Sequence, residues 1–270
     1  MRTLLACIIA AVALQCVCIA NDSLHKGRSI HSWLNDLVSD QPEQRVRAES
    51  ELLLIGTNAI PAMLDYVTSV GSAFSPHDSS VAYRAFDILG QTARPAIPKL
   101  SALANDANYS TDACNALFLV GRETVPIFVA CLTNQDHRIR ENALGKIIGF
   151  ALSTNSPADL QVALPAIRAL IKGSKTVDAQ ALVALRVVST NGNEFVADVI
   201  PLLKSQDDTT RWCAVEALKI YGPNAKTAIP ALLMIANDPI EKVRTSVAFA
   251  IQAIDPEAAK RHSIKPPVYE

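Results

Sequence analysis

Apolar residues recur at the spacing of an amphipathic helix along most of this chain, most clearly in residues 207–238. Four residues spaced i, i+3, i+4 and i+7 form one apolar face in the first half of this stretch: Ala214, Ala217, Leu218 and Tyr221. A second such face follows in the other half: Ile229, Leu232, Leu233 and Ala236. This periodicity predicts two consecutive amphipathic helices.

The residues at the helix boundaries support this prediction. Asp207 or Asp208 can accept hydrogen bonds from the first backbone N–H groups of the first helix. Gly222 can adopt the left-handed conformation that ends a helix, and Pro223 prevents its continuation. Pro230 is placed in the first turn of the second helix, where a missing N–H group does little harm. Neither helix can bury its apolar face alone, so stacking against further copies is expected.

Copies of this unit recur along the chain. Each contains an apolar residue followed by proline, and these pairs lie 28 to 39 residues apart: Ile60-Pro61, Ile97-Pro98, Val125-Pro126, Leu164-Pro165, Ile200-Pro201 and Ile229-Pro230. Turn-rich insertions at residues 70–80 and 153–157 account for the wider spacings. Four glycines are interpreted as helix ends: Gly90, Gly121, Gly149 and Gly222.

The fold expected from this repetition is all-α: a right-handed α-solenoid of about six helical hairpins with terminal capping helices. A helix over residues 29–38, with Trp33 and Leu34 on its apolar face, would cover the first hairpin. Residues 241–254 open a seventh unit that does not close. The tail from Asp255 onwards, rich in proline, is expected to be extended.

The short motifs of these units resemble those of HEAT repeats, in particular the short kind found in phycobilin lyases and in exported bacterial HEAT-repeat proteins. The resemblance rests on Val46-Arg47, Ile139-Arg140 and Val243-Arg244 in first helices, and on Ala59-Ile60-Pro61 before a second helix. It covers about residues 29–260, and it is weaker at residues 79–132 and near Gly192. It implies a binding role rather than a particular reaction, since such repeats serve many functions.

The amino-terminal segment has a different composition. Residues 1–20 combine Arg2, an apolar run and small residues before Ala20, which predicts a signal peptide cleaved after Ala20 and export to the periplasm or the exterior. The alternative is an uncleaved membrane anchor. Residues 21–28 are expected to form a linker, and residues 261–270 an extended tail.

The charge balance excludes some partners. The net charge is −1, and removal of Arg2 with residues 1–20 changes it to about −2. A near-neutral chain lacks the basic surface that nucleic acid or an anionic membrane would require. We therefore expect a protein or peptide partner, no nucleic acid, and membrane association only if residues 1–20 are retained.

No catalytic or cofactor-binding motif is present, so no cofactor and no metal are expected. His77 and His137 lack ligand partners at metal-binding spacing. We favour a non-enzymatic scaffold. The alternative is an enzyme or an accessory subunit of the lyase type, with a site on the inserted loops near His77 or Asn155, although no residue of a bilin site can be identified.

Three cysteines would remain after cleavage: Cys114, Cys131 and Cys213. Their apolar neighbours favour buried positions for all three. A disulfide between Cys114 and Cys131 is left open by the sequence.

Acidic residues precede the arginines of several first helices. The acidic residues are Asp40, Asp136, Asp207 and Asp238, and the arginines are Arg47, Arg140, Arg211 and Arg244. The resemblance to HEAT repeats implies that the aspartate of one turn pairs with the arginine of a neighbouring repeat. The alternative is an anion-binding site.

The second helices carry the candidate partner-binding residues, because in HEAT solenoids these helices line the concave face. Positions not needed for the core form the candidate set: Leu64, Asp65, Lys99, Ile127, Val129, Arg168, Leu202, Lys204, Leu233 and Met234. Such a wall could bind a peptide or a partner helix. Alternatively, these side chains pack between adjacent second helices.

Overall fold

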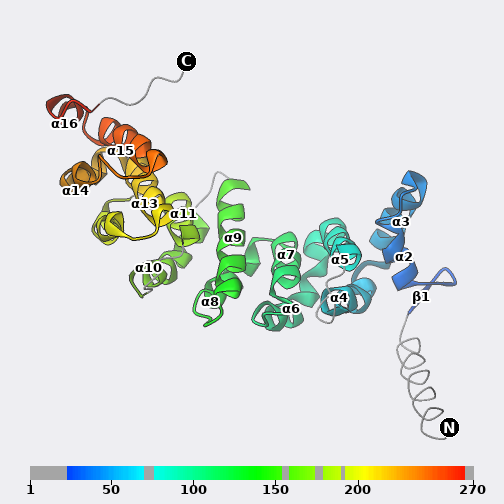
Figure 1. Cartoon of the computed structure of the whole chain (residues 1–270). Coiled ribbons are helices and arrows are strands. Elements are labelled where there is room, and N and C mark those ends of the chain that lie inside the picture. Colours follow the sequence, from blue (N-terminus) through cyan, green and yellow to red (C-terminus); the bar gives the residue numbers. More distant parts are fainter. Residues whose placement is uncertain (1–22, 70–75, 154–157, 174–178, 190–191, 265–270) are drawn as a thin grey trace, which may run out of the picture. The chain divides into compact units, whose positions relative to one another are not determined.

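The computed structural model describes residues 23–69, 76–153, 158–173, 179–189 and 192–264 (Figure 1). The chain divides into two compact units at Thr124 and Val125, and each is described by itself. In both units the described residues form short helices in sequence, apart from one small hairpin.

The first unit contains a two-stranded hairpin followed by helices. Its elements are β1 (Leu24–His25), β2 (Arg28–Ser29), α2 (Ile30–Asp36), α3 (Pro42–Ile55), α4 (Ile60–Ser69), α5 (Pro76–Leu89), α6 (Ile97–Ala104) and α7 (Ser110–Val120), with 3-10 segments η1 (Gly56–Ala59), η2 (Gly90–Ala96) and η3 (Arg122–Thr124). Helix α5 packs against both α3 and α7, while α4 packs on α5 and α6 on α7.

The second unit continues the same alternation. Its helices are α8 (Val125–Cys131), α9 (His137–Ser153), α10 (Leu164–Gly173), α11 (Ala179–Val188), α12 (Val196–Val199), α13 (Asp208–Tyr221), α14 (Ile229–Met234), α15 (Glu241–Ile254) and α16 (Pro256–Arg261). Its 3-10 segments are η4 (Ala158–Ala163), η5 (Gly192–Phe195), η6 (Ile200–Lys204) and η7 (Gly222–Ala228). Helix α13 packs between α11 and α15, and α11 packs on α9.

The helical hairpin predicted for residues 207–238 is confirmed. Asp207 caps α13, its carboxylate accepting from the Thr210 backbone N–H at 2.7 Å. Gly222 ends the helix with φ 55°, a conformation that glycine adopts without a steric penalty. A 3-10 segment, η7, joins the two helices and was not predicted. The stacked, all-α repeat fold is thus present in both units.

Residues 24–29, expected to belong mostly to a linker, form an antiparallel hairpin instead, with Leu24 opposite Ser29. Lys26 and Gly27 have φ of 52° and 75°, as a tight two-residue turn requires. Glu51 of α3 fixes this turn, because it accepts from Lys26 at 2.6 Å and lies 2.7 Å from His25. The hairpin is therefore part of the folded unit.

Two further sequence interpretations are wrong. Gly149 is not a helix end: α9 continues to Ser153 and buries Phe150 beyond the glycine. The chain after Asp255 does not at once become extended, because Asp255 caps α16 through the Ala258 N–H at 3.0 Å, and α16 buries two alanines. The predictions for residues 1–20 and 265–270 lie outside the described residues.

The three cysteines predicted to be buried are buried, as thiols rather than as a Cys114–Cys131 disulfide. Burial raises the pKa of both Cys131 and Cys213 above the usual thiol value. Neither thiol is therefore poised as a nucleophile.

The burial of α13 between its neighbours predicts how substitutions on this helix change the stability of the chain. Leu218 is completely buried, so Leu218→Ala should lower the free energy of unfolding by about 2–5 kcal/mol, as measured by urea denaturation. Ile220→Ala on the same helix is the control, since Ile220 is 54% exposed. Equal losses for the two variants would contradict the packing described here.

Candidate partner-binding surface

The ten candidate residues lie on the second helices α4, α6, α8, α10 and α14 and on η6. Six are half-buried: Leu64, Ile127, Val129, Arg168, Leu202 and Leu233. Four are exposed: Asp65, Lys99, Lys204 and Met234. Three of the candidates belong to the first unit (Leu64, Asp65 and Lys99), and the other seven belong to the second.

Position relative to the repeated proline explains this burial. The second residue after each proline is buried in every copy: Met63, Leu100, Phe128, Ile167, Leu203 and Leu232. The fourth is an exposed alanine in three copies: Ala102, Ala130 and Ala169. The outermost face of these helices is therefore formed largely by small side chains.

Ion pairs hold two of the candidates. Arg168 of α10 lies 2.5 Å from the Asp198 carboxylate of α12, which Lys172 also contacts at 2.8 Å. Burial alone would raise the pKa of Asp198, but hydrogen bonds from Lys172 and Arg168 hold it below the usual value. Asp65 lies 3.2 Å from His31. Arg168 thus joins adjacent second helices as well as facing outward.

A pocket of about 340 Å³ lies on this face of the second unit. Side chains from α10, from the connection that follows α8 and from the start of α9 line it: Leu132, Thr133, Asn134, Arg140, Ala166, Ala169 and Leu170. None of the ten candidate residues is in this lining; Arg168 lies on α10 between Ala166 and Ala169, and Val129 lies on α8 before the connection. The lining combines an apolar floor with polar side chains, the usual composition of a recognition pocket.

A second concavity, between α13 and α15, was missed from the sequence. Its floor contains Trp212, whose indole N–H donates to the Ser246 hydroxyl at 3.0 Å. The Lys242 ammonium lies 3.3 Å from the centre of the indole ring, a cation–π contact. An aromatic residue outside the predicted apolar face was the signal that could have identified this surface.

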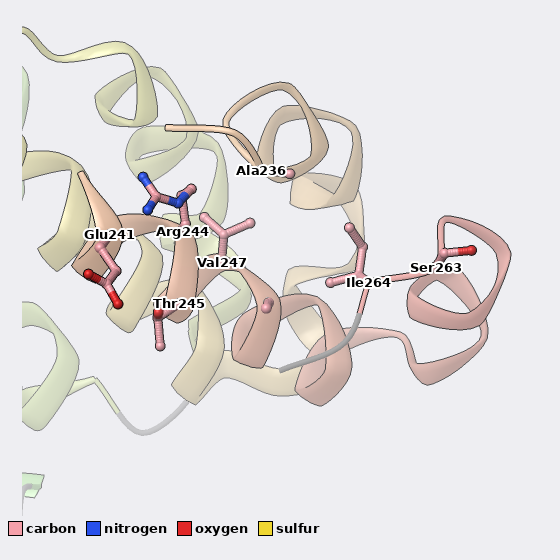
Figure 2. Close-up of a pocket in the computed structure, with 8 residues that line it drawn as sticks. Ala236, Glu241, Arg244, Thr245, Val247, Ser263 and Ile264 are labelled. Atoms are coloured by element: carbon pink, nitrogen blue, oxygen red, sulfur yellow. The ribbon is translucent and has the colours of Figure 1, made fainter. Parts of the chain in front are cut away.

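A third pocket, of about 430 Å³, lies on α15 (Figure 2). It is lined by Ala236, Glu241, Arg244, Thr245, Val247, Ala248, Ser263 and Ile264. Figure 2 shows Ile264 and Ser263, which follow α16, to one side of the α15 residues.

A turn closed by arginine precedes four of the first helices. In each copy a side-chain oxygen accepts from the backbone N–H two residues later: Ser39 from Gln41, Asn134 from Asp136, Ser205 from Asp207 and Asp238 from Ile240. The guanidinium of an arginine in the following helix donates to the carbonyl oxygen of the first residue of the turn. The pairs are Arg45 to Ser39 at 2.6 Å, Arg140 to Asn134 at 2.9 Å, Arg211 to Ser205 at 2.8 Å and Arg244 to Asp238 at 2.7 Å. We call this unit the arginine-closed turn.

The arginine-closed turn corrects the register read from the sequence in the first copy. Arg45, three residues before buried Ala48, corresponds to Arg211 before Ala214, whereas Val46-Arg47 only matches the motif letters. Val46 is 63% exposed. The Arg47 guanidinium instead lies 5.4 Å from the centre of the Trp33 ring.

The predicted pairing of aspartate with a neighbouring arginine is confirmed for Asp238. Arg211 holds its carboxylate with two hydrogen bonds, Nε to Oδ2 at 2.8 Å and Nη2 to Oδ1 at 3.0 Å. The other aspartates behave differently: Asp136 pairs with Arg138 in its own turn, and Asp207 with Thr210. At these two copies the aspartate is thus bound within its own turn and does not pair with an arginine of a neighbouring repeat.

Among the described residues, no group of three His, Cys, Asp or Glu side chains could hold a metal ion. Burial raises the pKa of Tyr221 to about 12, too high for acid–base work near neutral pH. Within the same parts of the chain, every helix falls short of the length and hydrophobicity that crossing a bilayer requires.

Comparison with known proteins agrees with the repeat fold. Residues 163–252 match the family model described as HEAT repeats. No curated protein sequence matches the chain.

Solved structures similar to the chain have low sequence identity. One is an engineered protein with 19% sequence identity and a TM-score of 0.47; the alignment covers 86% of this chain and 70% of the engineered protein. A designed armadillo repeat protein in complex with the peptide (KR)4 is 16% identical, with coverage of 84% and 99% and a TM-score of 0.46. A computationally designed armadillo repeat protein for modular peptide recognition is 16% identical, with coverage of 84% and 100% and a TM-score of 0.49.

The Arg211–Asp238 pair predicts a pH-dependent stability. The hydrogen bond from Arg211 lowers the pKa of Asp238 below its usual value, although burial opposes this. Removing the charge in Asp238→Asn should cost about 2 kcal/mol at neutral pH, the order expected for hydrogen bonds to a charged group. The contribution should be present above about pH 4, where the carboxyl of the unfolded chain is ionised, and be lost as the pH falls through the lowered folded pKa.

Urea denaturation of both proteins over a pH series measures this difference. Asp40→Asn, at an exposed aspartate, serves as the control and should change stability little at any pH. A difference between the native chain and Asp238→Asn that grows on acidification would refute the assignment.

Proposed function

Because residues 163–252 carry HEAT repeats, we propose that this chain is a non-enzymatic scaffold that binds another protein through the second-helix face of its second unit. The binding point is the pocket lined by α10 and by the residues that follow α8, here called the α8–α10 pocket. The observation that supports the proposal is that α10, which carries the candidate Arg168, lines this pocket through Ala166, Ala169 and Leu170.

The shape and chemistry of the pocket suit a peptide or a partner helix. Ala166 and Ala169 present no bulky side chain, so a partner backbone can approach α10 closely. Leu132 and Leu170 provide an apolar floor for one inserted side chain. Arg140 is anchored through Nη1 to two carbonyl oxygens at 2.9 Å, which fixes the polar edge of the pocket before any partner arrives.

The same proposal places the scaffold in the cell envelope or outside the cell. It rests on the charge, apolar run and small residues of positions 1–20, which have the pattern of a cleaved signal peptide. The partner is then another exported protein or the exposed part of a membrane protein.

Site-specific photo-crosslinking in the native cells tests the binding point. A crosslinking amino acid at Ala169 should give a discrete adduct, whereas the same amino acid at Leu152 of α9 should not. Leu170→Asp should reduce the adduct by about tenfold or more, since an unpaired charge in an apolar contact is costly. No adduct at position 169, or the same adducts at both positions, would overturn the proposal.

Mass spectrometry of the purified native protein tests the export. The expected amino terminus is Asn21, after loss of residues 1–20. A chain that retains Met1 would show that the segment is not removed, and it would favour a membrane anchor over release.

A further inference from the structure

Arg244 of α15 repeats the geometry of Arg211 of α13 with one difference. In both arginines Nη1 donates to two carbonyl oxygens of the preceding turn: Arg211 to Ser205 and Gln206 at 2.8 and 3.1 Å, and Arg244 to Asp238 and Pro239 at 2.7 and 2.9 Å. Arg211 uses its remaining edge, Nε and Nη2, to hold the Asp238 carboxylate. Within the described residues, no carboxylate contacts the corresponding edge of Arg244.

The pocket around Arg244 corresponds to the surface that α13 buries against α15. Its lining residues Arg244, Thr245, Val247 and Ala248 are equivalent to four residues of α13: Arg211, Trp212, Ala214 and Val215. On α13, Ala214 and Val215 are completely buried and Trp212 bonds to Ser246 of α15. On α15, Thr245 and Ala248 remain half-exposed beside a pocket of about 430 Å³ (Figure 2).

We propose that this pocket binds the amino end of a helix from a partner protein, with an acidic residue in the turn just before that helix, so that the helix stacks on α15 as α15 stacks on α13. The partner's aspartate or glutamate would accept two hydrogen bonds from Nε and Nη2 of Arg244, as Asp238 does from Arg211. The inference is independent of the α8–α10 pocket, since the two pockets share no residue.

The guanidinium of Arg244 is the feature of the pocket that selects an acidic occupant. The arginine fork is planar, carries a permanent charge and matches a carboxylate in two-point geometry. Nη1 is already engaged by carbonyl oxygens, so the guanidinium is held in place before the partner binds. Ala248 is half-exposed and small, so a stacked helix can approach it closely, while Val247 is already buried at the base of the pocket.

The chain itself provides a probe, a synthetic peptide of residues 237–254, which contains Asp238 and the α15 sequence. The peptide is added at up to millimolar concentration to the full chain, and the side-chain Nε–H signal of Arg244 is followed by NMR. This signal is assigned from its absence in Arg244→Lys. We expect it to shift on titration, and we expect a peptide with Asp238→Asn to bind about tenfold more weakly or worse.

Two variants of the protein complete the test. Ala248→Glu places a negative charge in the pocket and should abolish the shift. Lys242→Ala changes the net charge equally on the same helix but lies outside the pocket, so it should bind as the native chain does.

Three results would overturn the proposal: no shift at Arg244, equal affinity for the two peptides, or equal effects of the two variants. If a chain ending at Ile264 bound the peptide while the full chain did not, the occupant would be residues 265–270 rather than a separate partner.

Discussion

The connection between one hairpin and the next is the point on which the repeat depends, because it leaves backbone carbonyls that no helix satisfies. In four copies an arginine from the following first helix donates to these oxygens, at 2.6 to 2.9 Å for the first of them. The positive charge also lies where the carbonyl ends of the preceding helix concentrate negative potential. In these four copies one side chain therefore ties the following first helix to the turn before it.

Position relative to the repeated proline determines which surface is left for binding. The second residue after each repeated proline is buried in the core, and the first and third are largely half-buried. The fourth is therefore the position that the proposed partner would meet most directly. Ala102, Ala130 and Ala169 at this position make the face smooth, and specificity must come from what borders it. In the second unit these borders are the Arg168–Asp198–Lys172 cluster and the pocket at Leu170.

The sequence predicted the helices well and the connections poorly. Spacing alone identified the hairpin of residues 207–238, because burial of Leu218 and Leu232 follows directly from helical period. It misplaced the first arginine by two residues, since Val46-Arg47 looks like the motif, while the actual donor, Arg45, is recognised only by where its guanidinium reaches. The hairpin at Lys26-Gly27 and the pockets depend on contacts between elements distant in sequence, which no local pattern encodes.

A stack built from one repeated interface exposes that interface wherever the repetition stops. In the first unit the hairpin and α2 cover α3: Trp33 is buried beneath Arg28, 4.4 Å from its ring centre, and Glu51 is held by Lys26. In the second unit, no described element covers α15 on the side of Arg244 in this way, although α16 packs nearby and Ile264 borders the pocket. Arg45 and Arg140 also close their turns with no carboxylate on Nε and Nη2 among the described residues, so the open edge alone does not distinguish Arg244. What distinguishes it is the pocket beside half-exposed Thr245 and Ala248, which we propose that another chain fills.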